Sequence, residues 1–221
     1  MTPTHHLPED LLAVYAAGTC GEPEALFVAT HLTLCKQCRD SLAVLESIGG
    51  HTIETITPMN VGVDVETLLA RVEASPSAKE DKPKVDEKVA SAQKQLADAG
   101  MPGVLAPYMP EGLKWRFLAP GVKQVELTLR WNDYPARLVK FPPGYVVPLH
   151  THPGPELTIV LTGAFEDGED KMQRGDVEVR DEAHRHELRI TKDATCICLF
   201  IADSAPIPLT WLGRILRPFL G

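Results

Sequence analysis

The spacing of hydrophobic positions along the chain divides it into two regions. Between residues 7 and 48, apolar side chains recur every three or four positions, as on one face of a helix. This pattern predicts a helix that ends at Gly18, a second that begins after Gly21, and a third that ends at Gly49 and Gly50, because glycine is common just beyond helix ends. The N-terminal region is therefore predicted to be a small helical bundle.

A fourth helix and a polar segment follow this bundle. The stretch from Val65 to Glu73 carries Leu68, Leu69 and Val72 on one side, with little local partner to bury them. From residue 75 to about residue 95 the chain is rich in Ser, Pro, Lys, Glu and Asp and has no aromatic residue, which predicts a linker. A thin helical stripe in this segment is expected to be exposed, and its members are Val85, Val89, Ala92 and Leu96.

From residue 113 to residue 208 the pattern changes to alternation and short β-branched runs. Five strands are predicted, at 125–129, 137–141, 157–161, 177–179 and 195–201. Many short strands separated by Gly and Pro are typical of an all-β sandwich or barrel. The predicted fold class is therefore α+β, with an all-α domain at 1–74, a polar linker at 75–100 and an all-β domain at 101–221.

Charge and composition exclude several classes of function. The 221 residues carry a formal net charge of -8, and no cluster of Lys and Arg is dense enough to bind nucleic acid directly. No apolar run approaches the roughly 20 residues of a membrane span, and the N-terminus has neither the basic nor the apolar part of a signal peptide. The expected location is the cytoplasm, and five cysteines fit that reducing compartment.

Three side chains that bind metals lie within eight residues, in the pattern His31-x3-Cys35-x2-Cys38. If this segment is one helix, positions i, i+4 and i+7 share a face, so the three can meet one ion. Zinc takes imidazole and thiolate in a closed tetrahedral shell when its role is structural, and it then needs a fourth ligand. Either His5 or His6 can supply that ligand, so we predict a zinc clamp.

The cysteines allow other interpretations. Cys35 and Cys38 are also spaced as a redox dithiol, and the thiolates that hold a metal are those that oxidise. Cys196 and Cys198 lie within a predicted strand and are expected to be core residues rather than ligands. Cys20 has no assigned role.

A second group of metal-capable residues lies in the β region. On a strand, alternate residues face the same side, so His150 and His152 are expected to point together into the barrel. Glu156 returns on the neighbouring segment after a Pro-Gly-Pro turn. Two imidazoles and a carboxylate suit a first-row metal, and a third imidazole is expected from His184 or His186.

The segment from Gly144 to Gly163, with its two histidines and its glutamate, matches the first cupin motif in full, so the β domain resembles a cupin, a jelly-roll barrel. The second motif departs from the common pattern, because Gly175-Asp176 is followed by no Pro-x-Gly before the next histidine pair. The N-terminal His-x3-Cys-x2-Cys pattern resembles the zinc-binding anti-sigma domain. The whole chain is thus similar to the ChrR-type anti-sigma factors, in which these two domains are joined in this order.

The resemblance implies a regulator that binds an extracytoplasmic-function sigma factor through its helical domain and keeps it from RNA polymerase. It implies that the cupin senses singlet oxygen or related oxidants, with zinc in the first domain and zinc or another first-row divalent metal in the cupin. The ligands implied are His6, His31, Cys35 and Cys38 in the first domain and His150, His152, Glu156 and His186 in the second.

Two other functions are alternatives. A barrel that holds three histidines and a glutamate around a metal is also the site of cupin dioxygenases and isomerases, where an open coordination position activates oxygen or a carbonyl. The other alternative is a regulator that binds a small metabolite in the barrel. A free-standing oxygenase has no evident use for a fused zinc domain, so the chain is not expected to be an enzyme.

Overall fold

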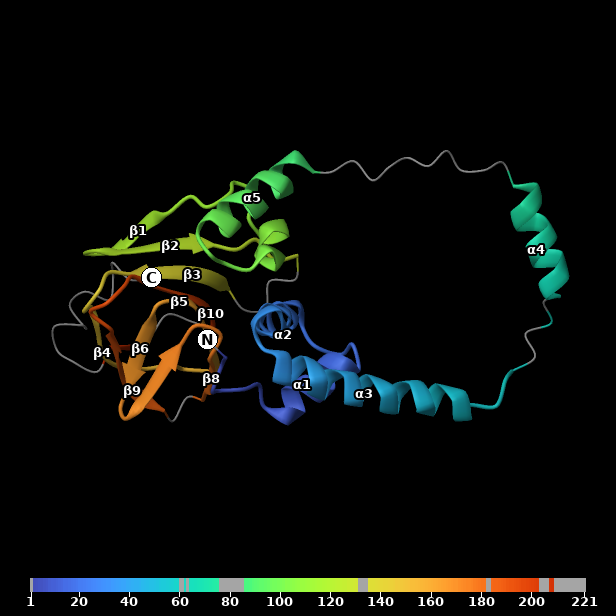
Figure 1. Cartoon of the computed structure of the whole chain (residues 1–221), viewed down its shortest axis with the longest axis horizontal. Helices are drawn as coiled ribbons and strands as arrows, with labels where there is room; N and C mark the ends of the chain where they lie inside the picture. The colour runs from blue at the N-terminus through green and yellow to red at the C-terminus, as the bar shows by residue number, and fades with distance from the viewer. Residues whose placement is uncertain are drawn as a thin grey trace.

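The computed structural model describes residues 2–59, 62, 64–75, 86–130, 135–181, 184–202 and 207–208. Its helices are α1 (Glu9–Ala16), α2 (Glu22–Leu34), α3 (Lys36–Thr55), α4 (Val65–Ala74), α5 (Glu87–Asp98) and the 3-10 helix η1 (Gly103–Tyr108). Its strands are β1 (Arg116–Ala119), β2 (Val122–Glu126), β3 (Ala136–Phe141), β4 (Val146–Thr151), β5 (Glu156–Thr162), β6 (Ala164–Asp167), β7 (Asp170–Gln173), β8 (Val177–Arg180), β9 (Arg185–Ile190), β10 (Cys196–Ala202) and β11 (Ile207–Pro208). Helices first and strands afterwards confirm the predicted α+β class (Figure 1).

The ends of the first helices follow the predicted glycines, and the end of α3 does not. Gly18 has a φ of +69° just after α1, and α2 begins directly after Gly21. In contrast, α3 continues through Gly49 and Gly50 to Thr55, so the prediction that it ends at this pair is wrong. An interior glycine costs a helix only about 1 kcal/mol relative to alanine, and neither glycine here adopts the left-handed conformation that ends a helix.

The strands form two antiparallel sheets. One sheet has the order β1-β2-β3-β10-β5-β8, and the other has the order β11-β4-β9-β6-β7. The five predicted strands correspond to β2, β3, β5, β8 and β10, with ends shifted by up to three residues. The short strands β6 and β7 escaped prediction because they carry mostly charged and polar residues.

Two hydrophobic cores lie on opposite faces of the six-stranded sheet. One core fills the space between the two sheets and contains Cys196 and Cys198, which confirms them as core residues. The other lies between the outer face of the sheet and the helices. It includes Ala92 and Leu96 of α5, both fully buried, so the expected exposure of this stripe is wrong. Val85, the first residue of the stripe, lies outside the described residues.

Helix α2 joins the helical region to the cupin. It packs on β10 and β5 of the six-stranded sheet, and its Phe27 and Val28 are fully buried (Figure 1). The helices and the sheet therefore share one core, and the proposed divisions at residues 74 and 100 stay a prediction. Within the described ranges, no helix is long and apolar enough to cross a membrane.

Candidate metal centres

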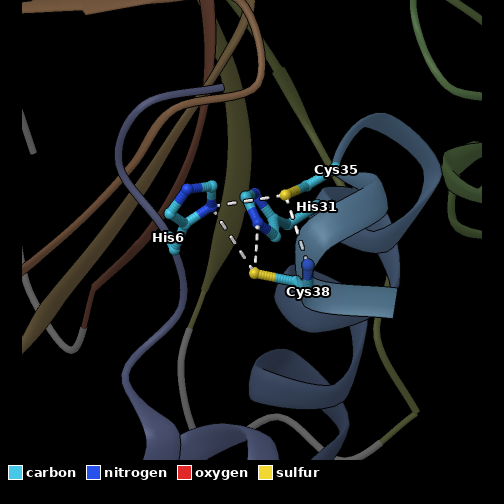
Figure 2. Close-up of side chains that lie close together, drawn as sticks. All are labelled: His6, His31, Cys35 and Cys38. Carbon is cyan, nitrogen blue, oxygen red and sulfur yellow. Dashed lines mark hydrogen bonds between the residues drawn. The ribbon is translucent and has the colours of Figure 1, made fainter. Parts of the chain in front are cut away.

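The clamp is built at the junction of two helices. Cys35 is extended, with φ -111° and ψ 111°, so it separates α2 from α3, as the prediction of separate second and third helices requires, and the condition of one helix through all three residues is not met. Its side chain caps α3, because the backbone N–H of Cys38 donates to Cys35 Sγ at 3.4 Å. The bend brings His31, near the end of α2, to Cys38 in the first turn of α3. The N-terminal arm (residues 2–8) supplies a fourth side chain, His6 (Figure 2).

The four side chains of the clamp have the spacing of a tetrahedral zinc site. His31 Nε2 lies 3.1 Å from Cys38 Sγ, and His6 Nδ1 lies 3.3 Å from Cys35 Sγ and 3.8 Å from Cys38 Sγ. Zinc bonds of about 2.3 Å to sulfur and about 2.0 Å to nitrogen set neighbouring ligands roughly 3.5 Å apart. The donor set and its dimensions therefore fit zinc, and Figure 2 shows the four side chains turned toward one another.

The two histidines of the N-terminal arm point in different directions. His6 turns toward the two cysteines, whereas His5 Nδ1 lies 3.5 Å from Asp176 Oδ2 in the cupin. The geometry thus places His6, and not His5, beside the other three clamp residues.

Burial controls the protonation of the clamp. It lowers the pKa of His31 to about 4, so this imidazole is neutral near pH 7. It raises the pKa of Cys38 to about 11, against an opposing hydrogen bond from the backbone of Leu7. Because zinc binds the thiolate, its binding must release the Cys38 proton.

Three imidazoles converge at the second centre, inside the cupin. His150 on β4 pairs directly with His186 on β9, and their ring centroids are 4.4 Å apart. His152 follows β4, with its ring centroid 4.9 Å from that of His150 and 5.7 Å from that of His186. All three side chains are buried, and burial lowers the pKa of His150 and of His152 to about 4. His150 and His152 are therefore neutral near pH 7 and able to bind a metal.

The hydrogen bonds of these imidazoles favour a metal. His150 Nδ1 donates to the carbonyl of Pro148 at 2.9 Å, and His186 Nδ1 lies 3.1 Å from Asp167 Oδ2. Among the described residues, His186 Nε2 and His152 Nδ1 are buried and have no hydrogen-bond partner, and His152 Nε2 has only its ion-pair contact with Glu156. Buried polar atoms are rarely left unpaired, and a metal ligand typically donates its other ring N–H to a carbonyl or carboxylate. The three histidines thus fit a first-row metal.

The predicted fourth ligand lies to one side of the three imidazoles. Glu156 Oε2 is 3.1 Å from His152 Nε2, but the carboxylate is outside the group whose ligand atoms all lie within 4.8 Å of one another. Burial raises the pKa of Glu156 to about 8, and the nearby carboxylate of Glu178 adds to this increase. His184 forms a different group with Asp167 and His186, and its Nε2 lies 3.7 Å from Asp167 Oδ2.

The residues that support both centres carry no clear signal in the sequence. Asp167 is on β6, where no hydrophobic pattern indicates a strand, yet it orients His186. Asp176 was noted only as part of an incomplete motif, and it contacts an arm about 170 residues away in the sequence. The one signal for Asp176 is the glycine before it, because a Gly-Asp pair indicates a tight turn just before a strand.

An apolar cavity of about 160 Å³ opens beside the second centre. His150, His152 and Glu156 line its polar end, together with Arg137. Its walls are mainly aliphatic and aromatic, and they include Leu118, Val139, Phe141, Tyr145, Leu188 and Phe200. One side of the imidazole group therefore faces a space that a small molecule can enter.

Comparison with known proteins gives the same picture along nearly the whole chain. Residues 108–204 match the model of the ChrR cupin-like domain. The anti-sigma-E factor ChrR of Cereibacter sphaeroides is 37% identical over 223 residues, which cover 99% of each chain. A crystal structure of Rhodobacter sphaeroides SigE in complex with the anti-sigma ChrR matches with a TM-score of 0.71 and 36% identity, over 91% of this chain and 100% of that one. The chain belongs to the ChrR family of anti-sigma factors.

Proposed function

We propose that the chain binds and inhibits an extracytoplasmic-function sigma factor and releases it when the cupin senses an oxidant of the singlet-oxygen type. The similar ChrR is named an anti-sigma-E factor, and a solved structure holds a ChrR together with SigE. On this proposal the chain is a regulator and not an enzyme.

One observation carries the proposal for sigma binding: an apolar surface that the chain itself leaves uncovered. On α4, the side chains of Val65, Leu68, Leu69 and Val72 recur at helical spacing, and no residue of this helix is buried. The part of α3 from Val44 onward has the same character, and Figure 1 shows α3 pointing away from the cupin and α4 lying apart from it. The exposed members on α3 are Val44, Ile48 and Ile53, followed by Ile56 just beyond the helix.

Such a surface suits a protein partner. Leu69 is 56% exposed and Val72 is 70% exposed, an arrangement that water disfavours and that a groove of another protein would cover. Amphipathic helices commonly bind partners by laying an apolar face into a groove, with anchors at i, i+3, i+4 and i+7. We refer to the exposed apolar residues of α3 and α4 as the apolar surface.

The test of sigma binding uses a double substitution on α4 of the full chain. Leu68→Ser with Leu69→Ser should weaken sigma binding by about 100-fold or more, because each lost leucine contact is worth about 1.5–3 kcal/mol. The matched control is Ala70→Ser, an exposed position on the other side of the same helix. Affinity is measured by titration with purified sigma factor. Wild-type affinity in the double variant would reject the apolar surface as the binding site.

The test of sensing uses a sigma-dependent reporter with and without oxidant. His150→Ala removes an imidazole of the second centre and leaves the apolar surface unchanged, so inhibition should persist while the response to oxidant is lost. Normal induction in a variant whose cupin holds no metal would place the sensor elsewhere, with Cys35 and Cys38 as the next candidates.

The apolar cavity favours a second candidate, a cupin that senses a small metabolite. Its volume of about 160 Å³ is similar to that of cavities that hold benzene-sized molecules. An apolar body with one oxygen-bearing group would fit the walls and reach the imidazoles. Release of the sigma factor by a compound such as benzoate, in the absence of oxygen, would favour this candidate over oxidant sensing.

A further inference from the structure

A loop of the cupin touches the clamp from outside the helical region. Residues 174–176 join β7 to β8, and Gly175 has a φ of +93°. A Cβ atom on Gly175 would lie 2.6 Å from Pro3 Cγ in the N-terminal arm and 3.4 Å from Leu34 Cβ at the end of α2. Only glycine therefore permits this backbone conformation and this close approach.

The carboxylate of Asp176 holds the N-terminal arm. This side chain is fully buried, and its Oδ1 accepts hydrogen bonds from the backbone N–H of Thr4 at 2.6 Å and of His5 at 3.0 Å. Its Oδ2 accepts from the backbone N–H of Gln173, the last residue of β7, at 2.8 Å. Charge-assisted bonds of this kind are stronger than neutral ones, and the next residue of the arm is His6.

The carbonyl of Gly175 orients the second imidazole of the clamp. His31 Nδ1 donates to this carbonyl at 2.8 Å, which places the lone pair of Nε2 opposite, toward Cys38 Sγ. A carbonyl that accepts from one ring nitrogen fixes the tautomer in which the other nitrogen is free to bind a metal.

The loop itself is anchored in the sheet. Gly175 N donates to the carbonyl of Val160 at 2.8 Å, and Val160 N donates to the carbonyl of Asp176 at 3.1 Å. Val160 is fully buried in β5, an interior strand that pairs with β10 and β8 in the six-stranded sheet. The loop therefore presents Gly175 and Asp176 to the clamp from a rigid support.

We propose that the Gly175-Asp176 loop positions two of the four clamp ligands, His6 through the N-terminal arm and His31 directly. On this proposal the cupin helps to hold zinc in the helical region, and a cupin movement at this loop would loosen the clamp. The proposal rests on the zinc clamp, and its test separates a failure of the positioning from a failure of the clamp.

The test measures how well bound zinc protects the clamp cysteines. Full-length, zinc-loaded protein is treated with an alkylating reagent, and modification of Cys35 and Cys38 is followed by mass spectrometry. Gly175→Ala should speed this modification by about 10–100-fold, the usual effect on metal affinity of losing an outer partner of a ligand. The matched control is Gly168→Ala, which has a similar positive φ of +62° but open space around the added Cβ.

Two further variants separate the arm contact from simple strain. Pro3→Ala removes the Cγ atom that the new Cβ would meet, so Gly175→Ala combined with Pro3→Ala should regain part of the protection, the part lost through the clash with the arm. Asp176→Ala should expose the cysteines as strongly as Gly175→Ala does. Asp176→Asn keeps one acceptor oxygen and should have a smaller effect.

Each outcome has a clear meaning. Wild-type protection in Gly175→Ala and in Asp176→Ala would overturn the proposal. Equal loss of protection in Gly168→Ala, or no recovery in the combined variant, would assign the effect to backbone strain and would also overturn it. If the zinc-loaded wild-type protein leaves Cys35 and Cys38 unprotected, the zinc clamp itself is wrong, which is a separate result.

Discussion

The two candidate metal centres differ in how completely side chains enclose them. In the clamp, four ligand atoms converge from the N-terminal arm, α2 and α3, and His31, Cys35 and Cys38 are each at most 3% exposed. In the cupin, three imidazoles converge and an apolar cavity lies beside them. Closed shells are typical of structural zinc, whereas an open position admits an exchangeable ligand. The first centre is therefore suited to stability and the second to response.

Strand β8 connects the residues that support the two centres. Asp176 precedes β8 and holds the N-terminal arm of the clamp. Arg180, at the end of β8, donates to Asp167 Oδ2 at 3.3 Å, and the same oxygen is 3.1 Å from His186 Nδ1. A displacement of β8 would thus reach the surroundings of both centres.

The largest expected effect comes from breaking the closed centre. Cys38→Ser should unfold or loosen the helical region and abolish inhibition, because a structural zinc contributes folding free energy of about 10 kcal/mol or more in small zinc domains. The measurements are zinc content, thermal unfolding and reporter output. Cys20→Ser, which alters a cysteine outside the clamp, is the control and should behave as the wild-type protein. A well-folded, inhibitory Cys38→Ser variant would remove the basis for the comparison.

Local motifs made both centres predictable in part. The members of each motif are close in sequence, so local backbone geometry brings them together. The clamp motif contains His31, Cys35 and Cys38, and the cupin motif contains His150 and His152. The six-stranded sheet was also predictable from local pattern, since β10 is continuously apolar and β5 contains the apolar run Ile159–Leu161.

The rest depends on contacts between distant segments. Asp176 contacts Thr4, and His31 contacts Gly175, only because α2 packs on the cupin sheet. No local spacing encodes such a pairing. The burial of the α5 stripe could not be predicted for a related reason, because the polar composition of this segment gives no sign that η1 packs on it.

The pH dependence of metal affinity should distinguish the two centres. The expected effect is smaller, about tenfold in affinity per pH unit, and it reflects proton release on metal binding. Zinc must displace the proton that burial keeps on Cys38, whose pKa is about 11, so the affinity of the clamp should rise with pH between 6 and 8 by at least this factor. His31, with a pKa of about 4, is already neutral and adds nothing. The measurement is chelator competition on the His150→Ala, His152→Ala protein, in which only the clamp binds zinc. A flat profile would show that Cys38 is already a thiolate.

The same experiment on the cupin decides the role of Glu156. Here the clamp stays loaded while cupin metal is titrated. The imidazoles of His150 and His152 are neutral throughout this pH range, so they release no protons. Glu156, with its pKa raised to about 8, holds a proton below that pH. If it is a ligand, metal affinity should rise by about tenfold per unit up to pH 8 and then level off. A flat profile would assign the site to the three imidazoles.

The smallest expected effect concerns the histidine next to the open centre. His184 is half-buried and pairs with Asp167, so His184→Ala should lower cupin metal affinity by only about twofold to threefold, through lost support of Asp167. His186→Ala, which removes a fully converging imidazole, is the positive control and should abolish binding. Both are measured by metal titration of the full chain. If His184→Ala loses metal as completely as His186→Ala, the ion lies between Asp167, His184 and His186. That position is on the far side of His186 from the cavity residues His150 and His152. The second centre would then no longer open onto the apolar cavity, and its contrast with the closed clamp would fail.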